Sequence, residues 1–320
     1  MLSSYRNLFV GHSNNIYYRL HGSSGGVGTS LLHYLLETQE VDGVIGVGFD
    51  EKNKTQAIYK FIDDPAKITQ LSGSKYVYMS LAPLLKLLTQ YSSKKLAVVV
   101  EPCFVKAVRK IAPHCKYVIS FFCGYNITSE GTNYLIRKSK IDRKDIEAID
   151  YRGGAYPGGF TIYTKGGVVK SFKKEHYELV DLLFLKDNCA KCRLFISDEA
   201  DMVLGDAWLK NYKNMTLLVV NTPLGEEILF NMYKKQWIAL YDIDRESVIK
   251  MHSHNLHYKN EGHSFWMRGI VFLFNNKIAV KIAPLYFLGW LSRMRRALMV
   301  GVNITLKLTN KHEHEFFEKM

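Results

Sequence analysis

The chain has 320 residues, of which 47% are hydrophobic and 23% are charged, and its 43 Lys and Arg outnumber 30 Asp and Glu. This composition is typical of a globular protein with one large core or two domains. No run of about 18 apolar residues occurs, which excludes a predicted membrane-spanning helix. Residues 1–15 contain neither a long apolar segment nor a small-residue cleavage site. We therefore expect a cytoplasmic protein.

The net charge of +13 favours anionic ligands, a nucleic acid or an anionic membrane surface as partners. Nucleic acid is the weaker candidate, because the sequence has no zinc-finger, homeodomain or ribonucleoprotein motif. The aromatic residues also lie in apolar runs and do not alternate with basic residues. We expect no nucleic-acid partner.

Apolar runs with a helical pattern alternate with apolar runs typical of strands through the first part of the chain. They predict a helix over 31–36, a strand over 41–49, a helix over 81–88, a strand over 96–100, a helix over 105–111 and a strand over 117–122. Residues 151–172 read as a β meander with a hairpin turn at Lys165-Gly166-Gly167, followed by a strand over 217–220 and a helix over 226–233. The predicted class is α/β, with mixed sheets, flanking helices and a smaller C-terminal extension.

Four of the five cysteines lie in short motifs. Cys103 and Cys123 each follow the end of a predicted strand, and Cys189 and Cys192 form a Cys-x-x-Cys pair. Four thiolates of this kind can hold an iron–sulfur cluster. The alternatives are buried packing thiols or an all-cysteine zinc site, although zinc sites of that type usually contain two such pairs. An odd number of cysteines without an export signal suits a reducing compartment.

Three glycine-containing loops are candidates for binding a cofactor. Residues 23–29 open the first predicted helix, where backbone N–H groups could bind phosphate, but no strand is predicted before them. Residues 71–77 combine a cation, hydroxyls and an aromatic ring, and 152–159 contain Arg, Tyr and four glycines. A turn is the preferred interpretation of the first loop taken alone. The second could be a surface turn entering a strand, and the third could equally be a hairpin connection.

Taken together, these motifs resemble the coenzyme F-420 hydrogenase/dehydrogenase beta-subunit family over about residues 5–235. The matching motifs, in order, are Ser24-Gly25-Gly26-Val27-x-Thr29, Val41-Asp42-Gly43-Val44, Gly73-Ser74-Lys75-Tyr76, Pro102-Cys103-x-Val105-x-Ala107-x-Arg109-Lys110, Phe122-Cys123, Tyr151-Arg152-Gly153-Gly154, Cys189-x-x-Cys192, Ala200-Asp201-x-x-x-Gly205-Asp206-x-Trp208 and Asn221-Thr222-x-x-Gly225. The resemblance implies an FAD- and 4Fe-4S-dependent oxidoreductase that passes electrons between a donor and an organic substrate.

The resemblance also implies roles for individual residues. Cys103, Cys123, Cys189 and Cys192 would ligate the cluster, whereas Cys115 is expected to be a packing thiol. The residues expected to bind the flavin or its phosphates are Ser24, Gly25, Gly26, Thr29, Ser74, Lys75, Tyr76 and Gly153. Lys75, Tyr76 and Arg152 are the expected catalytic residues, with Arg152 facing the flavin ring or the substrate.

The sequence departs from many relatives because it has no ferredoxin-type Cys-x-x-Cys-x-x-Cys run. We therefore expect electrons from a ferredoxin-like protein or a reduced nicotinamide. The chain resembles bacterial members found with surface-polysaccharide biosynthesis, which implies an organic substrate such as a sugar derivative. Two rivals remain: a non-redox binding protein with a structural all-cysteine metal site, and an electron-transfer subunit for a separate catalytic partner.

Residues 1–235 are expected to form the redox domain and 236–320 a basic, His-rich extension. His252, His254, His257 and His263 could hold a metal, but a solvated loop is the preferred interpretation. Residues 284–300 combine aromatic residues with Arg293, Arg295 and Arg296. This segment predicts peripheral contact with an anionic membrane or, as we prefer, a helix docked on the core.

Overall fold

The computed structural model describes residues 4–167, 169–172, 180, 184–253, 255–256 and 259. Its larger sheet has eight strands in the order β11-β1-β10-β9-β5-β4-β2-β3. Their bounds are β1 Asn7–Ser13, β2 Gly43–Phe49, β3 Ala57–Ile62, β4 Leu96–Val99, β5 Cys115–Phe121, β9 Met202–Asp206, β10 Thr216–Val220 and β11 Ile238–Asp242. The smaller sheet contains β6 Ile146–Gly153, β7 Gly159–Thr164 and β8 Val169–Phe172.

The helices cover both faces of the larger sheet. They are α1 Ile16–His21, α2 Val27–Glu37, α3 Leu81–Gln90, α4 Pro102–Ile111, α5 Ser129–Ser139, α7 Asp187–Lys191, α8 Pro223–Lys234 and α9 Arg245–Met251. Short 3-10 helices are η1 Pro65–Leu71, η2 Arg143–Asp145 and η3 Lys210–Tyr212. Buried residues of α3, α4 and α9 share one core cluster, and those of α1, α2 and α8 share another. The predicted α/β class is confirmed.

The centre of the larger sheet is parallel and its two sides are antiparallel. Strands β2, β4, β5 and β9 pair in parallel, while β3 and the β10-β1-β11 group pair antiparallel. Because β4 and β5 are parallel neighbours, the chain leaves both at the same edge of the sheet. Cys103 and Cys123 follow these two ends. Pro102 occupies the first turn of α4, so Cys103 lies inside that helix.

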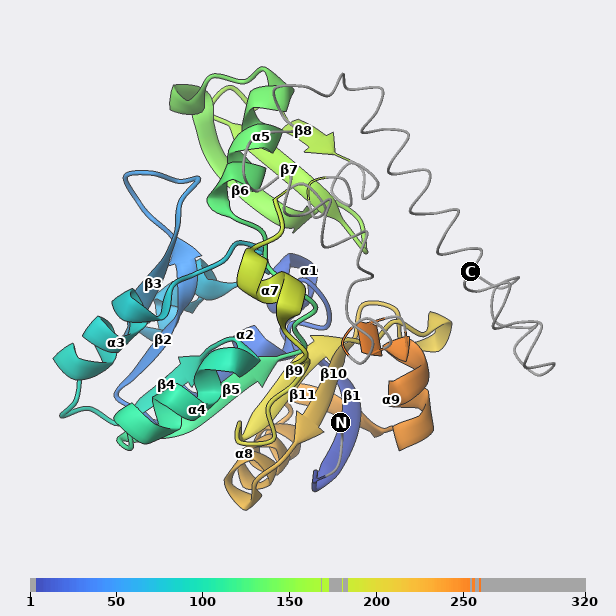
Figure 1. The fold of residues 1–320 in the computed structure, drawn as a ribbon. Helices are drawn as coiled ribbons and strands as arrows, with labels where there is room; N and C mark the ends of the chain where they lie inside the picture. The colour runs from blue at the N-terminus through green and yellow to red at the C-terminus, as the bar shows by residue number, and fades with distance from the viewer. Residues whose placement is uncertain are drawn as a thin grey trace.

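The smaller sheet forms its own layer with α5. Leu135 and Ile136 of α5 share a core cluster with Ile149 and Phe160 of β6 and β7. In Figure 1 this layer stands above the larger sheet, and α7 lies between the two. The hairpin predicted at 165–167 is confirmed between β7 and β8.

The structure differs from the sequence-based expectations at two strands of the larger sheet, β1 and β11. Strand β1 does precede the glycine-rich loop at 23–29, with α1 between them, so the expected lack of a strand there is wrong. Its sequence NLFVGHS has only a short apolar run, and it is held between β10 and β11 by long-range pairing. Strand β11 pairs with β1, and Val248 of α9 is in the core. The larger sheet therefore continues beyond residue 235.

The remaining part of the expected extension is not covered. His254, His257, His263 and residues 284–300, with Arg293, Arg295 and Arg296, lie outside the described residues. Across the part of the chain that is described, no helix has the length and apolar character needed to cross a bilayer.

Candidate functional site

The four cysteines from three distant segments line one pocket. Cys103 comes from the first turn of α4, Cys123 from the residues after β5, and Cys189 and Cys192 from α7 and its C-terminal end. The full lining is Tyr78, Glu101, Pro102, Cys103, Phe104, Cys123, Tyr125, Asn126, Cys189, Cys192, Leu194 and Lys259. Cys115 is not among these residues; it is buried in the core of the larger sheet.

Backbone hydrogen bonds bring the Cys-x-x-Cys segment to β5. The N–H of Cys123 donates to the carbonyl of Phe195 (2.9 Å), and the N–H of Lys186 donates to the carbonyl of Asn126 (3.1 Å). Ile127 also forms an isolated bridge with Leu185. The residues on either side of α7 thus lie beside the chain that follows β5. This places Cys189 and Cys192 near Cys123.

Burial raises the pKa of three thiols in this pocket, those of Cys103, Cys123 and Cys189. Cys103 is exposed as a residue, but partial desolvation of its thiol in the pocket raises its pKa to about 12, followed by the effects of Glu101, Cys192 and Cys189. The pKa values of Cys123 and Cys189 are also raised by burial, whereas Lys259 lowers both. Without a metal, the thiols of Cys103, Cys123 and Cys189 are therefore protonated at neutral pH. A bound cation would reverse that balance, since metal ligands must be thiolates.

Lys259 brings a positive charge to the pocket from the far end of the described chain. Its residue is 2% exposed, and its Nζ donates to the carbonyl of Cys192 (3.2 Å). Glu101 is 6% exposed, and burial raises its pKa to about 7. Asn126 Nδ2 faces the Glu101 carboxylate at 3.5 Å. The thiols are thus surrounded by buried polar groups.

The spacing of the four thiols bears on the kind of metal site. Within the described part of the chain, no three side chains of His, Cys, Asp or Glu are arranged as ligands of a single metal ion. A zinc ion needs four ligands around one point at about 2.3 Å. The four cysteines of a 4Fe-4S cluster bind different irons and stand farther apart. Four cysteine thiolates are a known ligand set for either kind of site.

The loop predicted to hold the flavin phosphates, at 24–29, lies against the loop predicted to line the flavin, at 73–76. Ser23 Oγ accepts a hydrogen bond from the N–H of Ser74 (2.7 Å), and the hydroxyls of Thr29 and Ser72 are 3.0 Å apart. The hydroxyls of Ser24 and Thr216 are 3.2 Å apart. The first two contacts tie the start of α2 to the loop that follows η1, and the third ties it to the start of β10.

Packing against backbone also explains the glycines of the first loop. Gly26 is the N-cap of α2 with φ of 75°, and a Cβ there would collide with the Tyr18 carbonyl. A Cβ at Gly25 would collide with the Gly11 carbonyl. Because Gly26 has no side chain, the first N–H groups of α2 have no side-chain cap. They could therefore bind an anion, but a bulky residue at Gly26 would also strain the fold.

Lys75 folds back onto its own loop. Its Nζ donates to the carbonyls of Leu71 (3.0 Å), Ser72 (2.6 Å) and Gly73 (3.1 Å). Burial lowers the pKa of Lys75 to about 7, and Asp150 opposes that shift. The ammonium group therefore closes the 71–75 loop, and the catalytic role expected of Lys75 stays a prediction.

Arg152 joins three of the motifs. Its Nη1 donates to Tyr76 Oη (3.0 Å) and to Asp206 Oδ2 (2.8 Å). The guanidinium lies 5.9 Å from the ring centre of Tyr156 and 5.4 Å from that of Trp208. Burial opposes the charge, but Tyr76 and Asp206 raise the pKa of Arg152 above its ordinary value. Gly153 contributes close packing, because a Cβ there would lie 2.7 Å from Thr161.

Among the described residues, one nitrogen of Arg152 has no protein acceptor. The side chain is 9% exposed, and its Nη2 is buried and has no hydrogen-bond partner. A buried donor of this kind costs roughly 1–3 kcal/mol unless it finds an acceptor. The guanidinium of Arg152 can therefore donate a hydrogen bond to one more acceptor.

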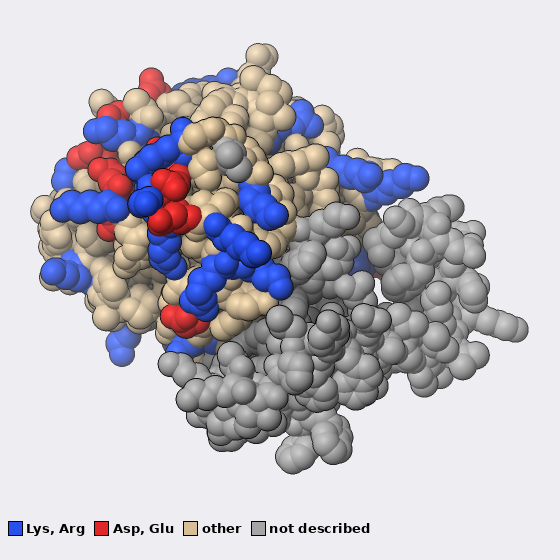
Figure 2. Space-filling model, turned by 90° about the horizontal axis from the view of Figure 1, so that it is seen from above, with Lys and Arg blue, Asp and Glu red and all other residues tan. Residues whose placement is uncertain are grey.

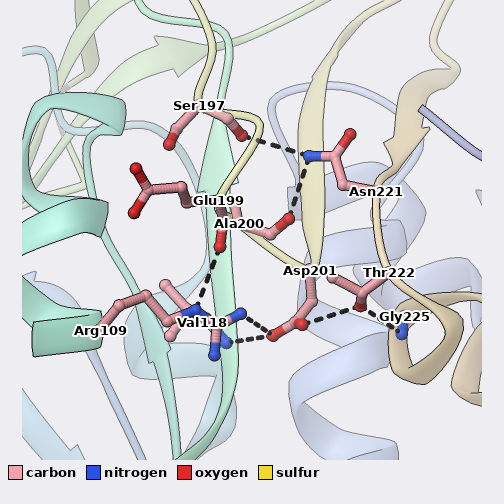
Figure 3. A network of polar contacts seen from close by, with 9 residues as sticks. All are labelled: Arg109, Val118, Ser197, Glu199, Ala200, Asp201, Asn221, Thr222 and Gly225. Atoms are coloured by element: carbon pink, nitrogen blue, oxygen red, sulfur yellow. Dashed lines mark hydrogen bonds and ion pairs between the residues drawn. The ribbon is translucent and has the colours of Figure 1, made fainter. Parts of the chain in front are cut away.

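The last two motifs form a structural network around Asp201 (Figure 3). Asp201 Oδ2 pairs with Arg109 Nη2 of α4 (2.7 Å) and accepts the N–H of Val118 in β5 (2.7 Å). Its Oδ1 accepts from Thr222 Oγ1 (2.8 Å), and Thr222 caps α8 through the N–H of Gly225 (3.1 Å). The network joins two helices to the parallel strands.

Comparisons with known proteins agree with this fold and these motifs. The family model for the N-terminal part of the coenzyme F420 hydrogenase/dehydrogenase beta subunit matches residues 8–88, and the model for its C-terminal part matches residues 93–246. The chain belongs to this beta-subunit family. The C-terminal match includes β11, so the family region continues beyond residue 235.

Several relatives in this family are oxidoreductases or their subunits. The chain is 25% identical to a coenzyme F420-dependent sulfite reductase of Methanocaldococcus jannaschii over 72% of its own length and 38% of the relative's. It is 25% identical to a coenzyme F420 hydrogenase subunit beta of Methanococcus voltae, over 69% of its length and 78% of that protein. It is 28% identical to an F420-dependent formate dehydrogenase subunit beta of Methanocaldococcus jannaschii, over 68% and 56%, respectively. The chain thus spans well under two thirds of two of these relatives.

A solved structure supports the fold. A chain of the F420-reducing [NiFe] hydrogenase complex from Methanosarcina barkeri superposes with a TM-score of 0.65 and 18% identity, covering 81% of this chain and 91% of that one. At this identity the likeness establishes the shared fold.

The family motifs did not reveal every residue of the site. Lys259 and Glu101 lie outside the cysteine and glycine motifs. The sequence signal of Asn126 is limited to its position four residues before Glu130 in a polar run. His252 was expected in a solvated loop, but it is 3% exposed and stacks on Phe122 with ring centres 4.6 Å apart. Its one available signal was its position at the end of a short amphipathic helix.

A second hollow lies between the β2–β3 hairpin and the smaller sheet. It is lined by Lys52, Asn53, Lys54, Thr55, Arg143, Lys144, Ile146 and Lys165. Lys54 pairs with Glu147, and Lys144 pairs with Asp142 (3.3 Å). Figure 2 shows basic and acidic side chains mixed on the described part of this side of the molecule. This hollow shares no lining residue with the thiol pocket.

Proposed function

We propose that this chain is a redox subunit that holds one 4Fe-4S cluster on Cys103, Cys123, Cys189 and Cys192 and binds FAD beside Arg152. The observation that carries the proposal is the single pocket lined by all four of these cysteines. They come from three segments that the fold brings together, within a family whose relatives are oxidoreductases or their subunits. When bound, the cluster exchanges single electrons and the flavin exchanges one or two.

The residues around the thiols would stabilise the charge of such a cluster. Four thiolates bring four negative charges into a pocket that is otherwise low in solvent. Lys259, buried beside the Cys192 carbonyl, offsets part of that charge. Because burial raises its pKa, Glu101 keeps its proton more readily than an exposed Glu. It therefore adds less negative charge to the pocket.

The flavin would be held by the loops that the structure joins at 23–29, 72–76 and 152–159. The buried Arg152 Nη2 lacks an acceptor, and a carbonyl oxygen or ring nitrogen of a flavin would supply one. Asp206 and Tyr76 orient the guanidinium through their hydrogen bonds. The N-terminus of α2, with no side-chain cap, suits the phosphates.

The electron donor and the organic substrate follow from the proposed cofactors. A ferredoxin-like protein or a reduced nicotinamide can supply electrons, and the names of the relatives add coenzyme F420 as a carrier to test. A sugar-derived substrate in surface-polysaccharide biosynthesis stays a prediction of the sequence, as do the cytoplasmic location and the peripheral membrane contact.

The proposal is tested by purifying the full chain without oxygen and measuring iron, sulfide and flavin. We expect about four irons per chain, with single Cys→Ser changes at the four pocket positions each removing at least half of the iron. Cys115→Ser, which changes a thiol outside the pocket, should leave iron unchanged. Arg152→Met should lower bound flavin and spare iron, whereas Arg143→Met should change neither. Stoichiometric zinc, or iron that persists without the four thiols, would contradict the cluster assignment.

A further inference from the structure

The rim of the thiol pocket is open to solvent on one side. Cys103 is exposed, whereas the other three pocket cysteines are of intermediate exposure. Leu194, which also lines the pocket, is 41% exposed. The pocket therefore meets water beside the first turn of α4, and an apolar side chain lies at that opening.

Three exposed cations stand close to this opening in the chain. Lys106 is one helical turn beyond Cys103, so the two share a face of α4. Lys191 and Arg193 flank Cys192. Among the described residues, none of these three side chains has an ion-pair or hydrogen-bond partner. Their charges are free to attract an anionic surface.

We propose that this rim, defined as Lys106, Lys191, Arg193 and Leu194, is the docking surface for a small acidic electron-carrier protein. The inference rests on the proposed function, because it assigns the partner of the same thiol pocket. An acidic carrier matches the three cations in charge, and the exposed Leu194 supplies an apolar contact. Steering by charge gives fast, short-lived encounters, as electron transfer between proteins requires.

The opening at Cys103 favours a one-electron protein over a nicotinamide at this surface. The carrier gives up one electron and the cluster gains that electron, with no bond formed or broken and no proton required. A reduced nicotinamide transfers a hydride, which carries two electrons and a proton, and a flavin accepts it. Its place would be the Arg152 group and not the rim.

The test is anaerobic stopped-flow reduction of the holoprotein by a reduced plant-type ferredoxin as the acidic probe. We expect the second-order rate constant of the unaltered protein to fall as salt rises, because salt screens exposed charges. The triple variant Lys106→Glu/Lys191→Glu/Arg193→Glu should be slower by at least about tenfold at low salt. Its rate should no longer fall with added salt.

A matched control separates docking from total charge. Lys52→Glu/Arg143→Glu/Lys165→Glu makes the same charge change at the second hollow and should stay within about threefold of the unaltered rate. Leu194→Ala should weaken ferredoxin binding and keep the salt dependence. Equal losses in both triple variants, or a salt-independent rate in the unaltered protein, would overturn the docking surface.

Binding of oxidised ferredoxin separates this inference from the proposed function. Binding measured by calorimetry at low salt does not require a cluster in the chain. Binding that only the rim variants lose supports the surface even if iron analysis rejects the cluster. A chain that holds iron but binds ferredoxin no better than the rim variant would reject the surface alone.

Discussion

His252 shows at the residue scale how burial creates sensitivity to acid. It stacks on Phe122 and lies 5.4 Å from the ring centre of Phe195. Burial lowers its pKa from 6.5 to about 4, against a small opposing effect of the Asp206 backbone. Between these values the unfolded chain binds more protons than the folded one. Stability should therefore fall as pH drops from about 6.5 to about 4.

The prediction is that His252→Phe removes this loss and keeps the ring stack. The full difference between the two pKa values corresponds to about 3 kcal/mol at pH 4 and below. Urea unfolding at several pH values should give the variant an advantage that grows through this window. His21→Phe, at an exposed histidine of α1, should follow the unaltered protein. A constant offset between His252→Phe and the unaltered protein across pH would exclude titration of His252 as the cause.

The Asp201 network acts at the scale of elements, because one carboxylate joins α4, β5 and the start of α8. Asp201 is 3% exposed, and removing Arg109 would leave its charge buried with only two hydrogen-bond donors. We predict that Arg109→Met lowers the free energy of unfolding by about 3 kcal/mol. A double-mutant cycle with Asp201→Asn should show a coupling energy between the two side chains.

The pair Arg137 and Glu130 of α5 provides the control for this prediction. Its atoms are 3.9 Å apart and its side chains are 63% and 58% exposed. Such a pair contributes about 0.5 kcal/mol or less, so Arg137→Met should have little effect on chemical unfolding. Similar losses at both arginines would mean that burial does not strengthen the Asp201 pair.

At the scale of the whole molecule, the thiol pocket depends on a residue far from its cysteines in the chain. Lys259 follows the eight-stranded sheet and α9, yet its Nζ reaches the Cys192 carbonyl. If the pocket holds the proposed cluster, the positive charge of Lys259 favours the reduced, more negative state. We predict that Lys259→Met lowers the midpoint potential by on the order of tens of millivolts.

Electron paramagnetic resonance during a redox titration would measure that potential. Lys234→Met, at an exposed position of α8, should leave it unchanged. Loss of iron in Lys259→Met would show that the lysine is needed to hold the cluster, which still places it in the site. An unaltered potential with full iron would remove Lys259 from the charge balance of the pocket.

The sequence by itself determined the elements whose side-chain pattern is local and strong. Helix α2 and strands β2, β4 and β10 were predicted because continuous or periodic apolar runs indicate burial within one short segment. The four cysteines that the sequence groups line one pocket, since two of them follow neighbouring parallel strands and the other two are close in the chain. Their role as ligands stays a prediction. Local motifs are sufficient for both results.

Only the tertiary structure decided what depends on contacts between distant segments. Strands β1 and β11 gain their places by pairing across more than 200 residues, which no local period records. Lys75 turns to its own carbonyls, while Arg152 meets Tyr76 and Asp206 from two other loops. Buried donors and charges must find partners wherever the fold brings them. The sequence therefore supplies the residue types that the chemistry of this site needs. The two sheets decide the geometry of the site, because they hold distant segments side by side.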